Sequence, residues 1–68
     1  MADSGTVKWY NATKRFGFIT SDKGGEDLFV HTDEIKTNDR TLMEGQRVTF
    51  NITQGRKGQQ ASNVTVVG

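Results

Sequence analysis

Apolar residues in this chain recur at every second position in short runs, and this spacing limits the folds that the chain can adopt. The pattern is clearest in "RFGFIT" (residues 15–20) and "RVTFNIT" (residues 47–53). A period of two is typical of β-strands, whose successive side chains point to opposite faces, whereas one face of a helix repeats every 3.6 residues. No window supports a helix of ten or more residues. The spacing therefore predicts an all-β protein.

Five segments have the length and composition of strands. They are rich in Val, Ile, Thr and aromatic residues, and turn residues bound them. They lie at about 5–12, 15–20, 27–32, 46–54 and 59–67. "TDEI" (residues 32–35) is expected to start a single helical turn capped by Thr32. Because five short strands in 68 residues cannot make a two-sheet sandwich of normal size, we predict one domain spanning residues 1–68, folded as a small closed or nearly closed antiparallel barrel.

Composition excludes several functional classes. The chain has no cysteine, which rules out disulfides and thiolate zinc sites, and it has a single histidine. No apolar run approaches the roughly 18 residues of a membrane span, and no arrangement of histidine, acid and nucleophile is typical of catalysis. We expect a cytoplasmic protein that is not an enzyme and has no cofactor, metal, membrane or small-molecule partner. A monomer is expected, with a dimer through an exposed edge strand left open.

Charge is unevenly distributed along the chain, although the net charge is only +1. Residues 5–20 carry three cations and no acid, and residues 45–68 also carry three cations and no acid. Residues 21–44 carry seven acids against three cations, a net of −4. If the two ends lie together in the fold, one face is basic.

The third predicted strand indicates which face the aromatic residues take. Phe29 and His31 share one face of this strand, and Leu28 and Val30 share the other. A lone strand phenylalanine is usually core. Here, burying Phe29 would also bury the histidine and leave two aliphatic residues in water. We therefore expect Phe29 and His31 to point outward.

The second predicted strand pairs with the third as a hairpin, so their outer faces are continuous. Burying Ile19 places Phe16 and Phe18 outside, and an exposed phenylalanine cluster is costly for solubility unless it binds something. Gly17 either avoids crowding inside a tight barrel or marks a bulge. The remaining core is expected from Val48, Phe50, Ile52, Val64 and Val66.

The first predicted strand contains "KWYN" (residues 8–11). Strict alternation puts Trp9 on the face of Val7 and would bury it. A first strand in a small barrel coils strongly, so parity is unreliable there and both orientations are left open. Tyr10 is expected to be exposed.

Flat aromatic side chains beside cations suit unpaired nucleic acid, because bases stack on the rings at about 1–3 kcal/mol each and cations follow the phosphates. Asn11 and Gln60 are candidates for base-edge contacts or are ordinary surface amides. Arg56 and Lys57 either contact a bound backbone or are solvated turn charges. The predicted function is sequence-tolerant binding of single-stranded nucleic acid. The alternative is a barrel that binds a peptide through its exposed aromatics, as SH3-like modules do.

Three stretches resemble the bacterial cold-shock proteins: "GTVKWYNATKRFGFIT", "DLFVHTDEI" and "LMEGQRVTFNITQGRKGQQASNVT". The resemblance covers roughly residues 4–67, and the family's motifs KGFGFI and VFVHF stand here as KRFGFI and LFVHT. It implies a five-stranded barrel of the oligonucleotide-binding (OB) type that binds single-stranded RNA and DNA. It also implies RNA chaperone activity, with effects on transcription and translation in the cold.

The resemblance also implies roles for individual residues. Stacking roles fall on Trp9, Phe16, Phe18, Phe29 and His31, so the resemblance favours an exposed Trp9. Contacts to phosphates or base edges fall on Lys8, Lys14, Asp27, Lys57 and Gln60. With Tyr10 and Asn11, these residues form the predicted nucleic-acid-binding site.

The sequence departs from the family pattern at three places. Arg15 stands where the first motif usually has glycine, and Thr32 replaces a phenylalanine of the second. The loop "KTNDRT" (residues 36–41) is one residue short of the common form and lacks its usual aromatic. Two missing stacking platforms predict weaker binding. One hypothesis is that Arg15, Arg40 and Arg56 offset part of this loss electrostatically.

Overall fold

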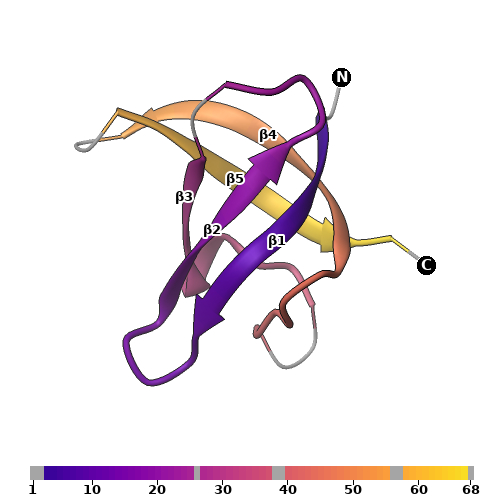
Figure 1. The fold of residues 1–68 in the computed structure, drawn as a ribbon. Helices are drawn as coiled ribbons and strands as arrows, with labels where there is room; N and C mark the ends of the chain where they lie inside the picture. The colour runs from indigo at the N-terminus through magenta and orange to yellow at the C-terminus, as the bar shows by residue number, and fades with distance from the viewer. Residues whose placement is uncertain (1–2, 26, 38–39, 56–57, 68) are drawn as a thin grey trace.

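The structure is a computed structural model, and it describes residues 3–25, 27–37, 40–55 and 58–67. Figure 1 shows its fold as a ribbon. Within these residues the strands are β1 (Asp3–Asn11), β2 (Phe16–Ser21), β3 (Leu28–His31), β4 (Arg47–Gly55) and β5 (Gly58–Val66). The five predicted strands are confirmed, with ends that differ by one or two residues.

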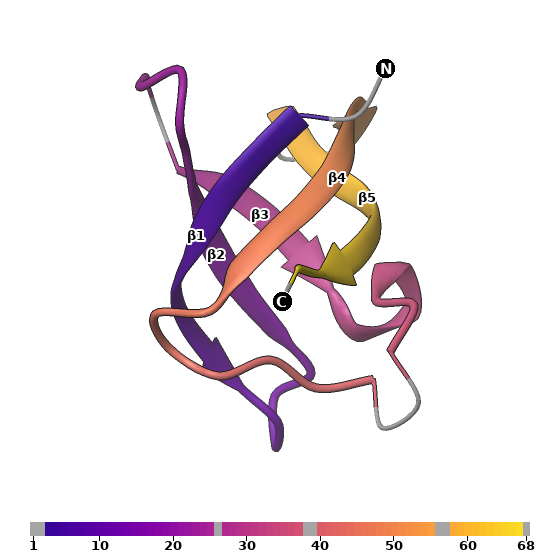
Figure 2. The same cartoon turned by 90° about the vertical axis from the view of Figure 1, so that its right-hand side faces the viewer.

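The strands close into a barrel in the order β1-β2-β3-β5-β4. Neighbouring strands are antiparallel except β3 and β5, which run parallel where Phe29 lies beside Gln60. Figure 2 shows the ring closing where β1 lies beside β4. Because the sheet closes on itself, each of these strands has a neighbour on both sides, and no unpaired edge strand remains among them.

The core of the barrel is aliphatic apart from one phenylalanine. Side chains at most 4% exposed come from all five strands and from the connection between β3 and β4. They are Val7, Ile19, Leu28, Val30, Ile35, Leu42, Val48, Phe50, Ala61 and Val64. The predicted inward positions of β2 and β3 are therefore confirmed, and Val66 packs against this core while partly buried.

Ile52 is an exception to the predicted core, because its side chain is 37% exposed. Burial in β4 ends at Phe50, and most of the residues that follow are exposed. Among the described residues, 51–55 pair only with β5, in a hairpin that extends beyond the rest of the barrel (Figure 1). Beyond Phe50, β4 has no second strand beside it in the described part of the chain, so the alternation continues without burying Ile52.

Two bulges interrupt the alternation of side chains. In β1 the register shifts between Val7, which pairs with Ile19, and Trp9, which pairs with Phe18, so Lys8 is an extra residue. In β5 the shift falls opposite the step from Thr49 to Asn51 in β4. Bulges increase local twist, which a small barrel needs in order to close.

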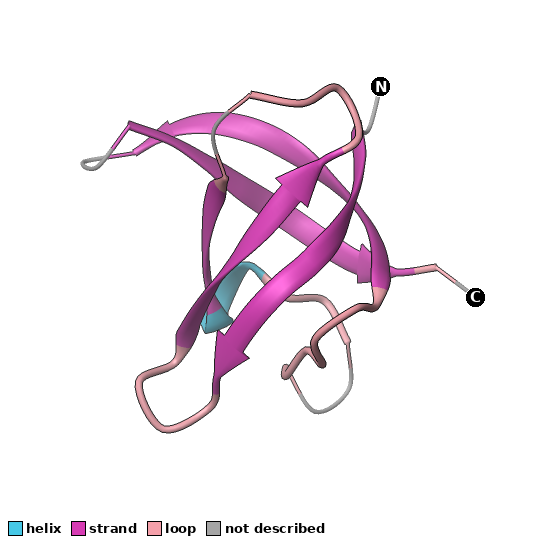
Figure 3. Cartoon of the chain, viewed as in Figure 1, coloured by secondary structure: helices cyan, strands magenta, loops and turns pink. Residues whose placement is uncertain are grey.

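A 3-10 helix, η1 (Thr32–Glu34), follows β3 directly (Figure 3). The predicted single turn is confirmed, but the predicted cap is wrong. His31 is the cap, and its Nδ1 accepts a hydrogen bond from the backbone N–H of Asp33 at 3.1 Å. Thr32 is instead the first residue of the turn. Within the described parts of the chain, no helix has the length and apolar character needed to cross a membrane.

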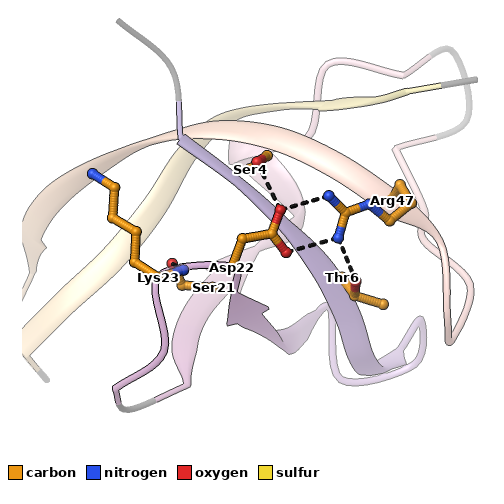
Figure 4. Close-up of polar contacts among 6 residues, drawn as sticks. All are labelled: Ser4, Thr6, Ser21, Asp22, Lys23 and Arg47. Carbon is orange, nitrogen blue, oxygen red and sulfur yellow. Dashed lines mark hydrogen bonds and ion pairs between the residues drawn. The ribbon is translucent and has the colours of Figure 1, made fainter.

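An ion pair with hydroxyl partners joins the β2–β3 turn to β4 across β1 (Figure 4). Asp22 accepts two hydrogen bonds from the Arg47 guanidinium and one from the Ser4 hydroxyl at 2.9 Å. The guanidinium also donates to the Thr6 hydroxyl at 2.9 Å. The bonds from Arg47 and then Ser4 lower the pKa of Asp22 from its ordinary value of 3.8 to about 2. This group holds together three segments that are distant in sequence.

Candidate functional site

Four aromatic side chains and one imidazole lie together on the outer face of β1, β2 and β3. Phe18 pairs with both Trp9 and Phe29, and Phe16 pairs with His31. All five side chains are half-buried, while the opposite face of β2 and β3 is the core. The predicted outward orientation of the phenylalanines and His31 is confirmed. We call Trp9, Phe16, Phe18, Phe29 and His31 the aromatic face.

The rings of the aromatic face support one another. Trp9 lies 5.5 Å from Phe16 and 5.4 Å from Phe18, measured between ring centroids. Phe29 is 5.6 Å from Phe16 in a stacked arrangement and 6.0 Å from Phe18 edge to face. Such pairs contribute about 0.5–1.5 kcal/mol beyond their buried area. Mutual contact therefore keeps the rings in place while leaving part of each accessible to a ligand.

Trp9 reaches this face through the bulge at Lys8. Alternation from Val7 would send the indole into the core, so the parity argument for Trp9 is wrong. The extra residue reverses the parity, and Trp9 then shares the face of Phe18. This is the orientation that the family resemblance implied.

Tyr10, by contrast, was expected to be exposed, and this expectation is wrong. It follows Trp9, pairs with Gly17 on the inner face and packs against the core. Its hydroxyl lies 2.7 Å from the Thr32 hydroxyl, which donates to the Arg40 carbonyl at 2.8 Å. Tyr10 therefore packs on the inner face of the sheet, and its hydroxyl contacts the segment between β3 and β4. The Thr32 side chain takes part in the same contact.

Gly17 lies where the backbone of β1 passes close to β2. A Cβ atom at this position would overlap the Trp9 carbonyl and would lie 2.8 Å from the Tyr10 Cα. Of the two interpretations of this glycine, crowding is the one that holds, since the bulge is in β1. Gly17 thus permits the close pairing of the two strands that carry the aromatic face.

Lys8 is held by a carboxylate at one edge of this face. Its Nζ lies 2.7 Å from Asp27 Oδ2, and the Thr20 hydroxyl donates to the other oxygen of Asp27 at 3.3 Å. The hydrogen bond from Lys8 lowers the pKa of Asp27 below 3.8. Thr20 was missed by the sequence reasoning, although it follows Phe16 and Phe18 at the same spacing of two.

Lys14 and Arg15 lie in the β1–β2 turn, at the other end of the aromatic face. Asn11 shapes this turn, because its side-chain oxygen accepts from the Lys14 N–H at 3.0 Å and its carbonyl accepts from the Arg15 N–H at 2.8 Å. Both cations are exposed. Among the residues that the structure describes, no carboxylate forms an ion pair with either.

His31 and Gln60 complete the part of the predicted site that can be placed. His31 is 43% exposed, with its Nδ1 occupied by the cap of η1. Gln60 pairs with Phe29 across the β3–β5 contact, and its amide lies over Gly55, where any Cβ atom would overlap it. Lys57 and Arg56 lie outside the described residues.

The arrangement offers several ring surfaces, cations at two edges and an amide beside Phe29. It contains no catalytic geometry among the residues described, and these hold no cluster of three or more His, Cys, Asp or Glu suited to a metal ion. Such a surface is suited to binding flat, negatively charged ligands by stacking and ion pairing.

Several known proteins are similar to this chain. Residues 3–67 match the family model of the "cold-shock" DNA-binding domain. Cold shock protein CspV of Vibrio cholerae is 55% identical over 65 residues, which is 94% of this chain and 93% of the relative. Cold shock protein ScoF of Streptomyces coelicolor is 59% identical over 63 residues, 91% and 94% of the two chains. Cold shock-like protein CspE of Escherichia coli K12 is 57% identical over 61 residues, 88% of each.

The fold itself recurs in a solved structure, Drosophila Unr CSD456. The match has a TM-score of 0.84 at 20% sequence identity, and it covers all of this chain but only 27% of that longer chain. At this identity the likeness concerns the barrel alone, and it supports the OB-type assignment.

Proposed function

The chain belongs to the cold-shock DNA-binding domain family, and from that membership we propose that it binds single-stranded RNA and DNA with low sequence specificity. Proteins of this family bind nucleic acid and are not enzymes, in agreement with the expectation from sequence. Nucleic-acid binding and a role in cold shock follow from membership itself. The preference for single strands is our proposal.

The observation that carries this proposal is the aromatic face. Its rings lie on an open sheet surface with cations at both ends. Unpaired bases can stack on such rings, whereas the faces of bases in a duplex are already covered by their neighbours. Because every base has a π-face, stacking tolerates many sequences, and low specificity follows.

Roles for individual residues are proposed on the same basis. Stacking falls to the five members of the aromatic face. Contacts to phosphates or base edges fall to Lys8, Asn11, Lys14, Asp27 and Gln60. Lys57, outside the described residues, keeps its predicted contact. We assign no stacking role to Tyr10, because it packs against the core.

RNA chaperone activity is the finer part of the proposal. A protein that binds only unpaired strands opposes weak RNA secondary structure by mass action. Effects on transcription and translation in the cold would follow from this. We further propose that the protein acts as a cytoplasmic monomer, and the closed ring of strands supports a monomer because it leaves no described strand without two neighbours.

Trp9 fluorescence tests the proposal directly. The protein is titrated with a pyrimidine-rich single-stranded oligonucleotide and, separately, with the matching duplex. We expect quenching by the single strand, much weaker quenching by the duplex, and a binding constant that falls with salt at a log–log slope of about −0.7 per phosphate neutralised. If neither ligand changes the emission at low salt, the proposal is wrong.

Peptide binding is the alternative function, and the same titration separates it. It predicts binding of a proline-rich peptide that is insensitive to salt, with no response to the oligonucleotide. The acid-free segment "KWYNATKRFGF" (residues 8–18) favours a phosphate-bearing ligand instead.

A further inference from the structure

Arg15 has an unfavourable backbone conformation beside the aromatic face. Its φ is +64°, in the left-handed region that non-glycine residues rarely adopt. Both of its backbone polar groups are used: the N–H donates to the Asn11 carbonyl at 2.8 Å, and the carbonyl accepts from the Thr32 N–H at 3.0 Å. Glycine would make the same two bonds without strain. What arginine adds at this position is an exposed positive charge.

The position of Arg15 connects that charge to the aromatic face. Phe16 follows it directly, and Phe16 pairs with His31 of β3. The residue that Arg15 bonds on β3, Thr32, follows His31. Arg15 therefore lies where β2 begins and β3 ends, next to Phe16 and His31 of the aromatic face. In Figure 1 this turn joins β1 and β2 at the opposite end of the barrel from the β2–β3 turn.

Three of the described cations form ion pairs with carboxylates. Lys8 pairs with Asp27 at 2.7 Å, Lys23 pairs with Asp3 at 2.8 Å, and Arg47 pairs with Asp22. These acids all lie near the start of β1 or between β2 and β3.

Lys14 and Arg15, in the β1–β2 turn, have no carboxylate partner in the described chain. A phosphate that approaches Lys8 must compete with Asp27, whereas one that approaches the β1–β2 turn meets no competing carboxylate among the described residues.

We propose that Arg15 binds a backbone phosphate of the nucleic-acid strand, and that the β1–β2 turn supplies more of the salt-dependent affinity than Lys8 does. A backbone outlier that persists beside a binding surface is a reason to look for function. The inference rests on the proposed function, because it needs a strand whose bases stack on the aromatic face. It makes the turn the electrostatic anchor of that strand.

Substitutions at Arg15 test this with matched controls. Arg15→Asn removes the charge but tolerates the left-handed conformation, and Arg15→Lys keeps the charge. Lys23→Gln changes the net charge equally at a cation paired with Asp3 at the other end of the barrel. Lys8→Gln removes the cation that Asp27 already neutralises. Each variant is titrated with the pyrimidine-rich single strand by Trp9 fluorescence, from about 50 mM to about 1 M salt.

We expect the salt slope of Arg15→Asn to be less steep by about 0.7, with an affinity about 5–10-fold lower at the lowest salt. Arg15→Lys should keep most of the slope, Lys23→Gln all of it, and Lys8→Gln should lose less than Arg15→Asn. Arg15→Gly should bind like Arg15→Asn and unfold at a Tm several degrees above that of the wild-type chain, since it removes the strain. It also provides the binding test if Arg15→Asn fails to fold.

Two results would overturn the inference and leave the proposed function intact: wild-type binding with unchanged slope and affinity in Arg15→Asn, or a larger slope loss in Lys8→Gln than in Arg15→Asn. A fall in Tm for Arg15→Gly would show that the arginine side chain stabilises the fold, which contradicts the argument from strain. No binding by the wild-type chain would overturn the proposed function and this inference together.

Discussion

Phe29 on β3 and Phe50 on β4 are the same residue type on opposite faces of the barrel sheet. Phe50 is 1% exposed and lies in the aliphatic core, whereas Phe29 is half-buried among the outer rings. Removing the Phe50 ring would leave a cavity that the surrounding strands cannot fill. Removing the Phe29 ring would open a surface that water can enter. The position of each ring, rather than its chemistry, decides what it contributes.

Phe29→Ala and Phe50→Ala therefore separate binding from stability. We expect Phe29→Ala to cost about 1–2 kcal/mol of unfolding free energy through lost ring contacts, and about 1–3 kcal/mol of oligonucleotide binding. Phe50→Ala should cost about 3–5 kcal/mol, enough to unfold most of a domain this small. Urea denaturation and oligonucleotide titration measure the two quantities. A Phe29→Ala variant that binds like wild type, or that is as unstable as Phe50→Ala, would contradict this assignment.

At the scale of the strand, alternation predicts burial wherever a strand is regular and covered. β2 and β3 satisfy both conditions, and the side chains of Ile19, Leu28 and Val30 are where their parity places them. β1 is irregular after Lys8, so parity places Trp9 on the wrong face. β4 is regular in this region, but after Phe50 its only partner among the described residues is β5, and Ile52 is exposed. Neither a bulge nor a missing neighbour leaves a clear mark in the local sequence.

The candidate site was predictable to a similar degree. Its rings follow from parity in two neighbouring strands, which a hairpin necessarily brings together. The pairing of Lys8 with Asp27 was not, because it depends on a bulge and on a contact across 19 residues of chain. The conformation of Arg15 was signalled only by the glycine that the family motif usually has at that position. Tyr10 was misplaced because the bulge reverses its face as well.

Gly17→Ala tests the close approach of β1 and β2. The added Cβ would overlap backbone atoms of Trp9 and Tyr10, which cannot move without breaking the pairing of the two strands. We expect a loss of about 3 kcal/mol or more in unfolding free energy, and a shifted Trp9 emission in the folded protein. Gly24→Ala is the control: it has open space at a φ of +82°, so it should cost about 1–2 kcal/mol through strain alone. Equal losses in urea denaturation would contradict the crowding argument.

For the whole molecule, the acidic residues do more than balance the charge of the two basic ends. Asp3, Asp22 and Asp27 each pair with a cation and together neutralise three of them near one end of the barrel. The cations of the β1–β2 turn are left without such partners in the described chain. A protein with a net charge of +1 thereby keeps a locally basic surface beside its aromatic face.

The ion pair between Asp22 and Arg47 joins three segments of the barrel (Figure 4). It should make the stability of the fold depend on pH, because it changes the pKa of Asp22 on folding. The guanidinium and the Ser4 hydroxyl lower the pKa of Asp22 from 3.8 to about 2. A carboxyl group with a lower pKa in the folded state stabilises the fold above its unfolded pKa, and this contribution disappears as the pH falls through the folded pKa. The Tm advantage of wild type over Asp22→Asn should therefore be constant above about pH 5 and shrink between about pH 4 and pH 2. Other carboxyls titrate alike in both proteins, so parallel Tm profiles across that range would show that Asp22 makes no such contribution.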